Sequence, residues 1–515
     1  MQVSRTRNTT RNATWGVVEK IVQMVLPFIT RTLILKLIGE QYLGLNSLFT
    51  SIISVLNMAD LGFGAAITYT MYRPIAEDDM PGLCSILNFY KKVYRVIGTA
   101  VLAIGLIIMP FLPHLINGSV PADINLYVLF SIYLANTVLS YWLFAYKKSL
   151  LHAYHRDDVN TKIATALHLL QYALQIAVLV VFDNYYAYVI VLPAITLLNN
   201  ITCAYVTKRM YPQVLCRGTI DKTLAKGIKR QVSGAFIGKI CGATRNSLDS
   251  VFISSFLNLT QVAIYSNYYY ILGAVHNLMN VFTTSMVGGV GNSIVKESLD
   301  KNYRDFSKFT FLYSWIAGWC SCCLLCLYQP FMRLWVGNSL IFPSGTMVLF
   351  CIYLYIMAAS DIKNVYYTAR GLWWEGRWRA LLEVLLNLIL NFVGAKYFGI
   401  FGILMATIIT MLLVNFLYGS KILFDNYFTN ASLSRYILQN VLYLVVTVAV
   451  SAVTYGICSL LPDRGFLYLF IKAGICLFLP NLLFLAAFCK TAVFADAKPL
   501  IQRILRGVTR KLKRR

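Results

Sequence analysis

Eight ionisable residues stand inside long apolar stretches of the sequence, where a charge is costly. The basic ones are Lys20, Arg31, Lys239 and Arg245, and the others are Asp60, Asp249, Glu383 and His276. A charged side chain at the centre of a bilayer costs about 2.5 to 3.5 kcal/mol on insertion scales, so such residues usually face a cavity or a partner. Because Arg and Lys both bind phosphate, the basic set predicts binding positions for a phosphate-bearing substrate. The other four predict sites that take up H⁺ or Na⁺.

The spacing of these residues groups them on helix faces but leaves a structural interpretation open. Lys20 and Arg31 are separated by about three helical turns and so share a face. Arg245 and Asp249 are one turn apart, close enough for an ion pair. In the structural alternative, Lys20 and Arg31 sit near helix ends and extend toward water, Arg245 and Asp249 only neutralise each other, and His276 is packed and hydrogen-bonded.

The composition indicates a protein built for lipid. Of 515 residues, 58% are hydrophobic and 13% are charged, whereas roughly a quarter of the residues of a soluble domain are charged. The net charge of +25 does not predict a nucleic-acid partner, because the basic residues lie in short loops rather than on one soluble face. The sequence also predicts contact with membrane lipids at the basic, amphipathic C-terminal tail.

The twelve cysteines lie mostly inside apolar stretches and form no framework of paired extracellular spacings. We interpret them as small packing residues. A cluster at Cys320, Cys322, Cys323 and Cys326 lacks the loop geometry of structural zinc, so the sequence predicts no metal site and no cofactor.

Apolar runs long enough to cross a bilayer recur along the chain and predict fourteen membrane-spanning helices. The first is a retained helix, because it is too long for a signal peptide and lacks a cleavage site. Most of the 46 Lys and Arg residues fall in loops on one side, which predicts a bacterial cytoplasmic membrane protein with both termini in the cytoplasm. The predicted spans are 15–38, 42–70, 92–113, 123–146, 162–182, 186–206, 232–256, 261–290, 308–329, 343–362, 380–396, 399–422, 436–460 and 466–489.

A weak internal repeat relates the two halves of the chain. At a shift of about 220 residues, Pro110-Phe111 aligns with Pro330-Phe331, and Tyr146 aligns with Tyr366. Repeated sets of spans are typical of transporters whose two lobes surround a substrate cavity. The predicted domains are a six-helix lobe over 1–215, a second six-helix lobe over 216–430, two further helices over 431–495 and a basic cytoplasmic tail over 496–515.

The sequence does not match the motifs of common enzyme classes. The run Gly234 to Lys239 resembles a phosphate-binding loop but has the wrong spacing and lies in an apolar stretch. The chain contains no recognisable Ser/His/Asp set, metal-spaced histidines or nucleotide-binding domain. We therefore predict that the protein is not an enzyme, and that any uphill work draws on an ion gradient, the membrane potential or the substrate's own gradient.

The first 90 residues contain a series of short motifs that match a known family. They are Arg11-Asn12, Trp15-Gly16, Pro27-Phe28-Ile29, Arg31-Thr32, Ile38-Gly39, Tyr42 to Phe49, Asp60 to Ile67 and Met71 to Asp78. In these motifs the chain resembles capsule and O-antigen repeat-unit flippases, the polysaccharide-transporter branch of the multidrug/oligosaccharidyl-lipid/polysaccharide exporter superfamily.

The resemblance implies translocation of an undecaprenyl-diphosphate-linked oligosaccharide from the cytoplasmic to the outer leaflet, by alternating access, during surface-polysaccharide assembly. A charged central cavity is expected in this family, which favours Arg31, Lys239 and Arg245 as ligands. The protein would work either alone or beside a polysaccharide polymerase and an initiating glycosyltransferase.

Two other functions remain open at this point. An ion-coupled multidrug exporter of the same fold usually has twelve spans and would favour acidic cavity residues for cationic drugs. A membrane-embedded glycan polymerase or glycosyltransferase would carry a large external loop, whereas the outer loops predicted here, such as 113–122, are short and nearly uncharged.

Overall fold

The computed structural model describes residues 5–57, 63–221, 247–463, 465–499 and 502. Over these residues the regular secondary structure is entirely helical. The chain forms two compact units, Met1–Ser266 and Asn267–Arg515, called the first and the second unit below. The fold class predicted from the sequence, an all-α polytopic membrane protein, is confirmed.

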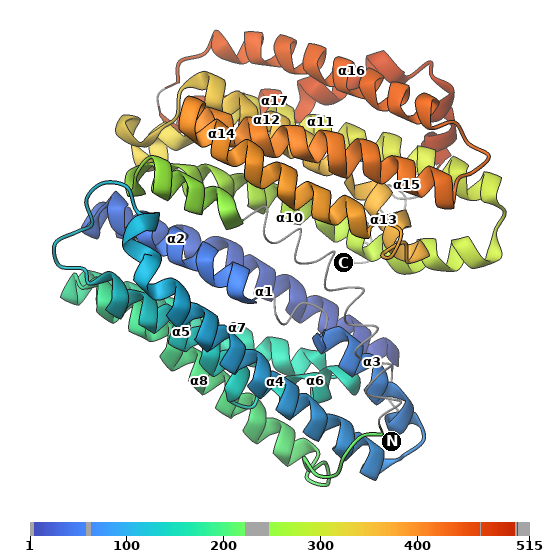
Figure 1. The fold of residues 1–515 in the computed structure, drawn as a ribbon. Coiled ribbons are helices and arrows are strands. Elements are labelled where there is room, and N and C mark those ends of the chain that lie inside the picture. Colours follow the sequence, from blue (N-terminus) through green and yellow to red (C-terminus); the bar gives the residue numbers. More distant parts are fainter. Residues whose placement is uncertain (1–4, 58–62, 222–246, 464, 500–501, 503–515) are drawn as a thin grey trace. The chain divides into compact units, whose positions relative to one another are not determined.

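The first unit is a bundle in which α5 packs against both α4 and α8, and α7 packs against both α1 and α8 (Figure 1). Its core contains Phe49, whose ring lies 5.5 Å from that of Phe130 and 5.7 Å from that of Tyr133. Asn125 caps α5, because its side-chain oxygen accepts from the backbone N–H groups of Tyr127 and Val128. The helices are α1 (Arg5–Leu33), the π-helix Ile34–Ile38, α2 (Glu40–Leu56), α3 (Phe63–Ala76), α4 (Met80–Ile108), the 3₁₀ helix Met109–Leu115, α5 (Leu126–Trp142), α6 (Ala145–Ala153), α7 (Asp157–Phe182) and α8 (Tyr185–Met210).

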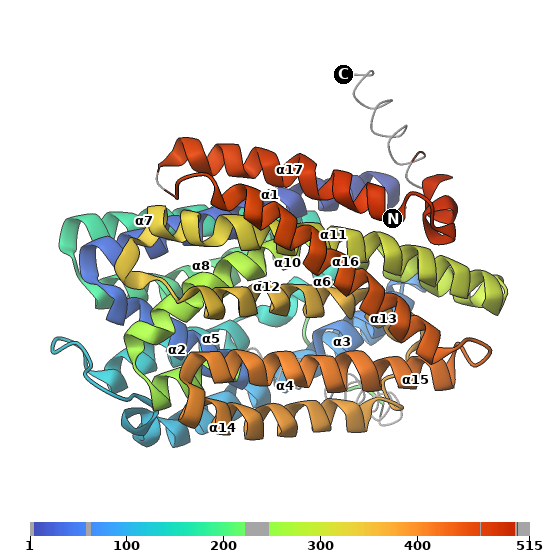
Figure 2. The ribbon, with the colours of Figure 1, turned by 90° about the horizontal axis from the view of Figure 1, so that it is seen from above.

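The second unit is organised around α11, which packs against α12, α16 and α17. Helices α16 and α17 also pack against each other, and Figure 2 shows both in red. The ring of Phe306 on α11 packs against those of Tyr366 and Phe428, with centroid distances of 5.1 and 5.0 Å. Helix α10 (Leu259–Lys296) begins in the first unit and continues into the second. The others are α11 (Leu299–Val336), the 3₁₀ helix Asn338–Leu340, α12 (Ser344–Ala359), α13 (Asp361–Arg370), α14 (Arg377–Thr410), the π-helix Met411–Tyr418, α15 (Gly419–Asn426), α16 (Leu433–Ser459) and α17 (Phe466–Phe488).

A glycine turn divides α14 into two arms. Gly399 has φ 58°, a left-handed conformation that favours glycine. The arms meet at Gly394 and Gly402, where a Cβ on Gly394 would lie 2.6 Å from the Gly402 backbone. This hairpin separates the predicted spans 380–396 and 399–422.

Nine helices among the described residues are long and apolar enough to cross a membrane, and a tenth if the bent pair Leu126–Trp142 and Ala145–Ala153 is one span. One of the nine, Arg377–Asn426, contains both predicted spans of the α14 hairpin. The predicted span 42–70 is divided between α2 and α3, and 261–290 falls within α10. Most of the predicted span 232–256 lies outside the described residues.

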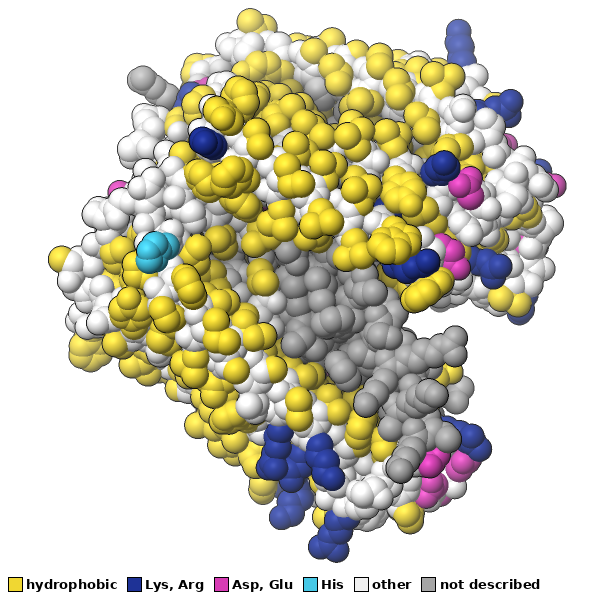
Figure 3. Space-filling view, in the orientation of Figure 1, with side chains coloured by type: hydrophobic (Ala, Val, Ile, Leu, Met, Phe, Trp, Pro, Cys, Tyr) yellow, Lys and Arg dark blue, Asp and Glu magenta, His cyan; other side chains and the backbone are white. Residues whose placement is uncertain are grey.

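Apolar side chains cover much of the helix surface. Phe182, Phe398 and Phe470 are exposed to 69%, 68% and 72%. On the face drawn in Figure 3, hydrophobic side chains spread over the helices, and the Lys and Arg side chains gather toward helix ends. Such a surface suits a lipid environment, where apolar side chains face hydrocarbon and charged ones reach the interface.

Candidate functional site

Arg31 is held in a defined position in the first unit. It lies in the last turn of α1 and is half-buried. Its Nη2 donates to the Oγ of Ser266 at 2.5 Å, and that hydroxyl donates to the carbonyl of Ala263 at 2.9 Å. The bond orients the planar guanidinium, which is the property that makes arginine a phosphate ligand.

Asp249 meets the same stretch of α10. Its side chain is completely buried, and its Oδ2 accepts from the hydroxyl of Tyr265 at 2.8 Å. Tyr265 and Ser266 are neighbours in sequence, so the structure attaches Asp249 and Arg31 to adjacent residues of α10. These two predicted site residues are therefore brought to one region of the first unit.

Lys20 is exposed on α1, whereas its neighbour Glu19, which the sequence analysis did not select, belongs to a polar cluster. Glu19 Oε1 lies 2.6 Å from Nδ1 of His168, and Thr165 donates to its other oxygen. Gln23 donates to Oε1 at 2.8 Å. Glu19 is thus a carboxylate held between an imidazole, a hydroxyl and an amide.

In the second unit, His276 joins a cluster centred on Asp361. His276 Nε2 lies 3.1 Å from Asp361 Oδ2, and the Tyr313 hydroxyl donates to the same oxygen at 2.8 Å. Asn280 approaches the other ring nitrogen of His276 at 3.1 Å. Both His276 and Asp361 side chains are 13% exposed. His276 is thus held by a carboxylate at one ring nitrogen and by an amide at the other.

Glu383 lies in a second polar cluster of the same unit. Its Oε2 is 2.9 Å from Nη1 of Arg379, one turn earlier on α14, and Asn415 donates to both of its oxygens at 3.3 and 3.4 Å. Lys363, 1% exposed, donates to the carbonyl and to the side-chain oxygen of Asn415. A Cβ on Gly419 would lie 2.5 Å from the Lys363 ammonium, so this glycine makes room for the charge.

Asn415 links the charged groups of this cluster. Its amide donates to Glu383, and its carbonyl and side-chain oxygens accept from Lys363. Since Glu383 is also paired with Arg379, these side chains form one network of charges.

Three of the predicted site residues, Asp60, Lys239 and Arg245, lie outside the described residues. The sequence analysis missed Asp361 and Lys363, because both fall at the edge of the predicted span 343–362. Their position at the start of α13, directly after the apolar α12, was the available indication.

Comparison with known protein families identifies the family of this chain. The family model described as "Polysaccharide biosynthesis protein" matches residues 9–287, which is more than half of the chain. This chain belongs to that family. No curated protein sequence matches it significantly.

Solved structures show the same fold at low sequence identity. The lipid II flippase MurJ in an inward closed conformation has a TM-score of 0.66 at 14% identity, and the match covers 93% of this chain and 98% of that one. An inward-facing MATE multidrug resistance transporter of the MOP superfamily has a TM-score of 0.59 at 13% sequence identity, and the match covers 78% of this chain and 97% of that one. A MOP superfamily transporter from Pyrococcus furiosus has a TM-score of 0.55 at 12% sequence identity, and the match covers 82% of this chain and 96% of that one. The family is therefore the one described as polysaccharide biosynthesis proteins, and the fold is the one found in these solved flippase and transporter structures.

Proposed function

We propose that this chain moves an undecaprenyl-diphosphate-linked oligosaccharide repeat unit from the cytoplasmic to the outer leaflet of a bacterial cytoplasmic membrane, with both termini in the cytoplasm. The family match over residues 9–287 is the observation that carries this proposal. The likeness to the fold of a lipid II flippase supports it. The product would serve surface-polysaccharide assembly, such as capsule or O-antigen, in concert with a polymerase and an initiating glycosyltransferase.

The diphosphate of such a substrate calls for oriented cations within the membrane. Arg31 supplies one, since its guanidinium is half-buried and fixed against Ser266. We assign Lys239 and Arg245 to the same role from their sequence positions, and Lys20 to the entrance of the path. Charge-assisted hydrogen bonds contribute about 1.5 to 3 kcal/mol each, so the loss of Arg31 should weaken recognition by roughly one to two orders of magnitude.

We propose coupling to H⁺, with the His276–Asp361 pair as the main proton site. The two side chains are shielded and in contact at 3.1 Å. In a carrier that alternates its access, protonation of such a pair favours one conformation only if the pair is held differently in the two states. Asp60, Asp249 and Glu383 are further coupling candidates, and Glu19 with His168 adds one in the first unit.

Gene deletion in the source bacterium tests the function. Loss of surface polysaccharide, with lipid-linked repeat units accumulating in the cytoplasmic leaflet, is the expected result. Absence of the lipid-linked unit itself would point instead to a biosynthetic enzyme. Unchanged polysaccharide with altered drug sensitivity would point to a multidrug exporter.

Complementation with variants then tests the cation. Arg31→Ala should restore membrane insertion but not export, and Arg31→Lys should restore export in part because it keeps the charge without the planar fork. Lys36→Ala is a matched control, because Lys36 is an exposed basic residue five positions later. Normal export by Arg31→Ala at wild-type protein level would overturn the role of Arg31.

A further inference from the structure

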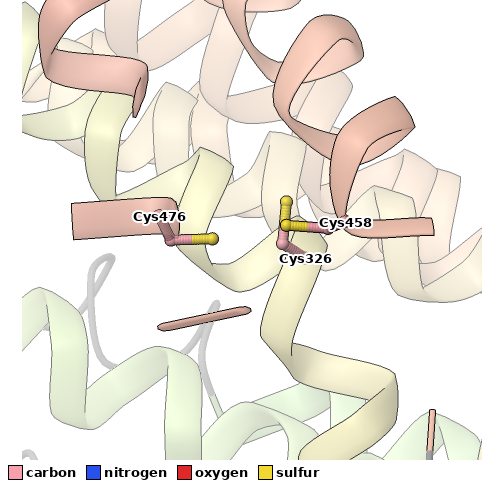
Figure 4. A group of neighbouring side chains, drawn as sticks. All are labelled: Cys326, Cys458 and Cys476. Carbon is pink, nitrogen blue, oxygen red and sulfur yellow. The ribbon is translucent and has the colours of Figure 1, made fainter. Parts of the chain in front are cut away.

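A group of buried thiols lies where α11, α16 and α17 meet. The three sulfur atoms of Cys326, Cys458 and Cys476 lie within 4.8 Å of one another, and the residues are 3%, 2% and 1% exposed. Figure 4 shows the sulfur of Cys476 pointing from α17 toward those of the other two. Cys322, fully buried, belongs to the same cluster. We propose that these residues form a thiolate site for Zn²⁺, a role separate from transport.

The geometry is close to what the ion requires. With Zn–S bonds of about 2.3 Å, ligand sulfurs of a tetrahedral site are about 3.8 Å apart. In the structure the sulfur–sulfur distances are at most 4.8 Å, which is about 1 Å longer than in a tetrahedral zinc site. Small rotations of the three cysteine side chains can close this difference. Cys322 stands one turn before Cys326 on the same face of α11 and belongs to the same buried cluster, so we assign it the fourth position.

The ligands come from three helices, which distinguishes them from the cluster weighed in the sequence. Cys320 to Cys326 alone lie on one helix and cannot surround an ion. Cys458 and Cys476 complete the group only through the packing of α16 and α17 on α11. Trp319 supports this packing, since its Nε1 donates to the carbonyl of Cys476 at 2.8 Å.

Nearby charges partly compensate the site. With Zn²⁺, three thiolates carry a net charge of −1, and the Cys322 thiolate as fourth ligand makes it −2. Asp463, in the turn between α16 and α17, pairs with Arg333 at 2.7 Å and with Lys472, which gives a local net charge of +1. Lys472 is one turn before Cys476 and Arg333 is two turns after Cys326, so both cations stand on the faces that bear the thiols.

Binding needs no redox partner. Each ligand loses its thiol proton to water and forms one metal–sulfur bond, and the oxidation state of zinc and sulfur does not change. The ion would fix α16 and α17, the two helices beyond the predicted six-helix lobes, to α11. The site is thus expected to contribute to stability rather than to the transport step.

Titration with Cd²⁺ as a spectroscopic probe tests the proposal. The full-length chain is purified in detergent, stripped of metal, and carries Cys489→Ser throughout, because Cys489 is exposed. We expect a sulfur-to-metal charge-transfer band that saturates at one equivalent, competition by Zn²⁺, and a rise in melting temperature on binding. Replacing a residue that only hydrogen-bonds to a metal ligand typically costs about 10- to 100-fold in metal affinity, so loss of a ligand itself in Cys476→Ser or Cys458→Ser should cost more than about 100-fold.

Cys351→Ser is the matched control, because Cys351 is a buried thiol of α12 whose sulfur contacts Met347 instead. It should bind the probe as the parent does. The absence of a saturable equivalent, or an unchanged titration in monodisperse Cys476→Ser and Cys458→Ser, would overturn the site. Recovery of a disulfide between α16 and α17 in protein that binds no metal would overturn it as well.

Discussion

Replacing Glu383 tests how the buried charges of the second unit are held. The Arg379 Nη1 and Glu383 Oε2 atoms are 2.9 Å apart, and the two side chains are 13% and 4% exposed. Breaking a buried pair by removing one partner costs about 3 to 5 kcal/mol, because the other charge is left uncompensated. We expect Glu383→Gln to lower the free energy of unfolding by about 3 kcal/mol, the lower end, since Arg379 keeps some access to solvent.

The same chemistry on the surface provides the control. Glu297 and Lys301 also form an i,i+4 pair at 2.7 Å in the second unit, but their side chains are 41% and 49% exposed. An exposed pair contributes less than about 1 kcal/mol, so Glu297→Gln should be nearly neutral. Replacing both buried partners, as in Arg379→Met with Glu383→Met, should recover part of the lost stability, because no unpaired Arg379 charge remains while Lys363 stays buried nearby.

The assay is unfolding of the purified protein by SDS in mixed micelles, for the wild type and each variant. A Glu383→Gln variant that loses no more stability than Glu297→Gln would refute the burial argument. A flipping assay on the same samples separates a structural role of the pair from a role in transport. If the pair is only structural, the folded Glu383→Gln variant should still transport.

Two further perturbations follow from close contacts. Gly394→Ala should destabilise the α14 hairpin by about 1 to 3 kcal/mol, because its Cβ would clash with the Gly402 backbone. Gly474→Ala should not, because a Cβ there meets no atom within 4 Å. Unfolding in detergent compares the stability of the two variants. Asp361→Asn removes the charged partner of His276, so flipping in liposomes should lose its dependence on a pH gradient. Flipping that keeps that dependence would assign proton coupling elsewhere.

The spans were predictable because they rest on local properties of the chain. Apolar length alone located most of the helices, and the break between residues 396 and 399 matches the turn at Gly399. What local pattern could not supply is the split of the span 42–70 into α2 and α3. Boundaries also shifted, since α4 begins at Met80 and α1 at Arg5, before their apolar runs.

The partners of the polar residues were not predictable, since they come from distant parts of the chain. His276 was expected to be hydrogen-bonded, but its partner Asp361 lies on α13. Glu19 has its partner His168 on α7, 149 residues away in the sequence. Only pairs within one helix, such as Arg379 with Glu383, could be read from an i,i+4 spacing.

The cysteines show the same limit. Their burial in apolar helices was expected, and packing is the role that local sequence supports. The approach of Cys458 and Cys476 to Cys326 depends on three helices meeting, which no spacing within one helix encodes.

The most direct test of the central claim is flipping by the purified protein. Liposomes containing this chain and a fluorescent lipid-diphosphate oligosaccharide are assayed for the fraction of substrate accessible to a reagent that cannot cross the membrane. We predict that the protein equilibrates the substrate between leaflets, and that Arg31→Ala slows this roughly 10- to 100-fold, as expected for loss of one charge-assisted contact. A substrate that stays in its original leaflet in the presence of folded wild-type protein, under an imposed pH gradient, would contradict the account.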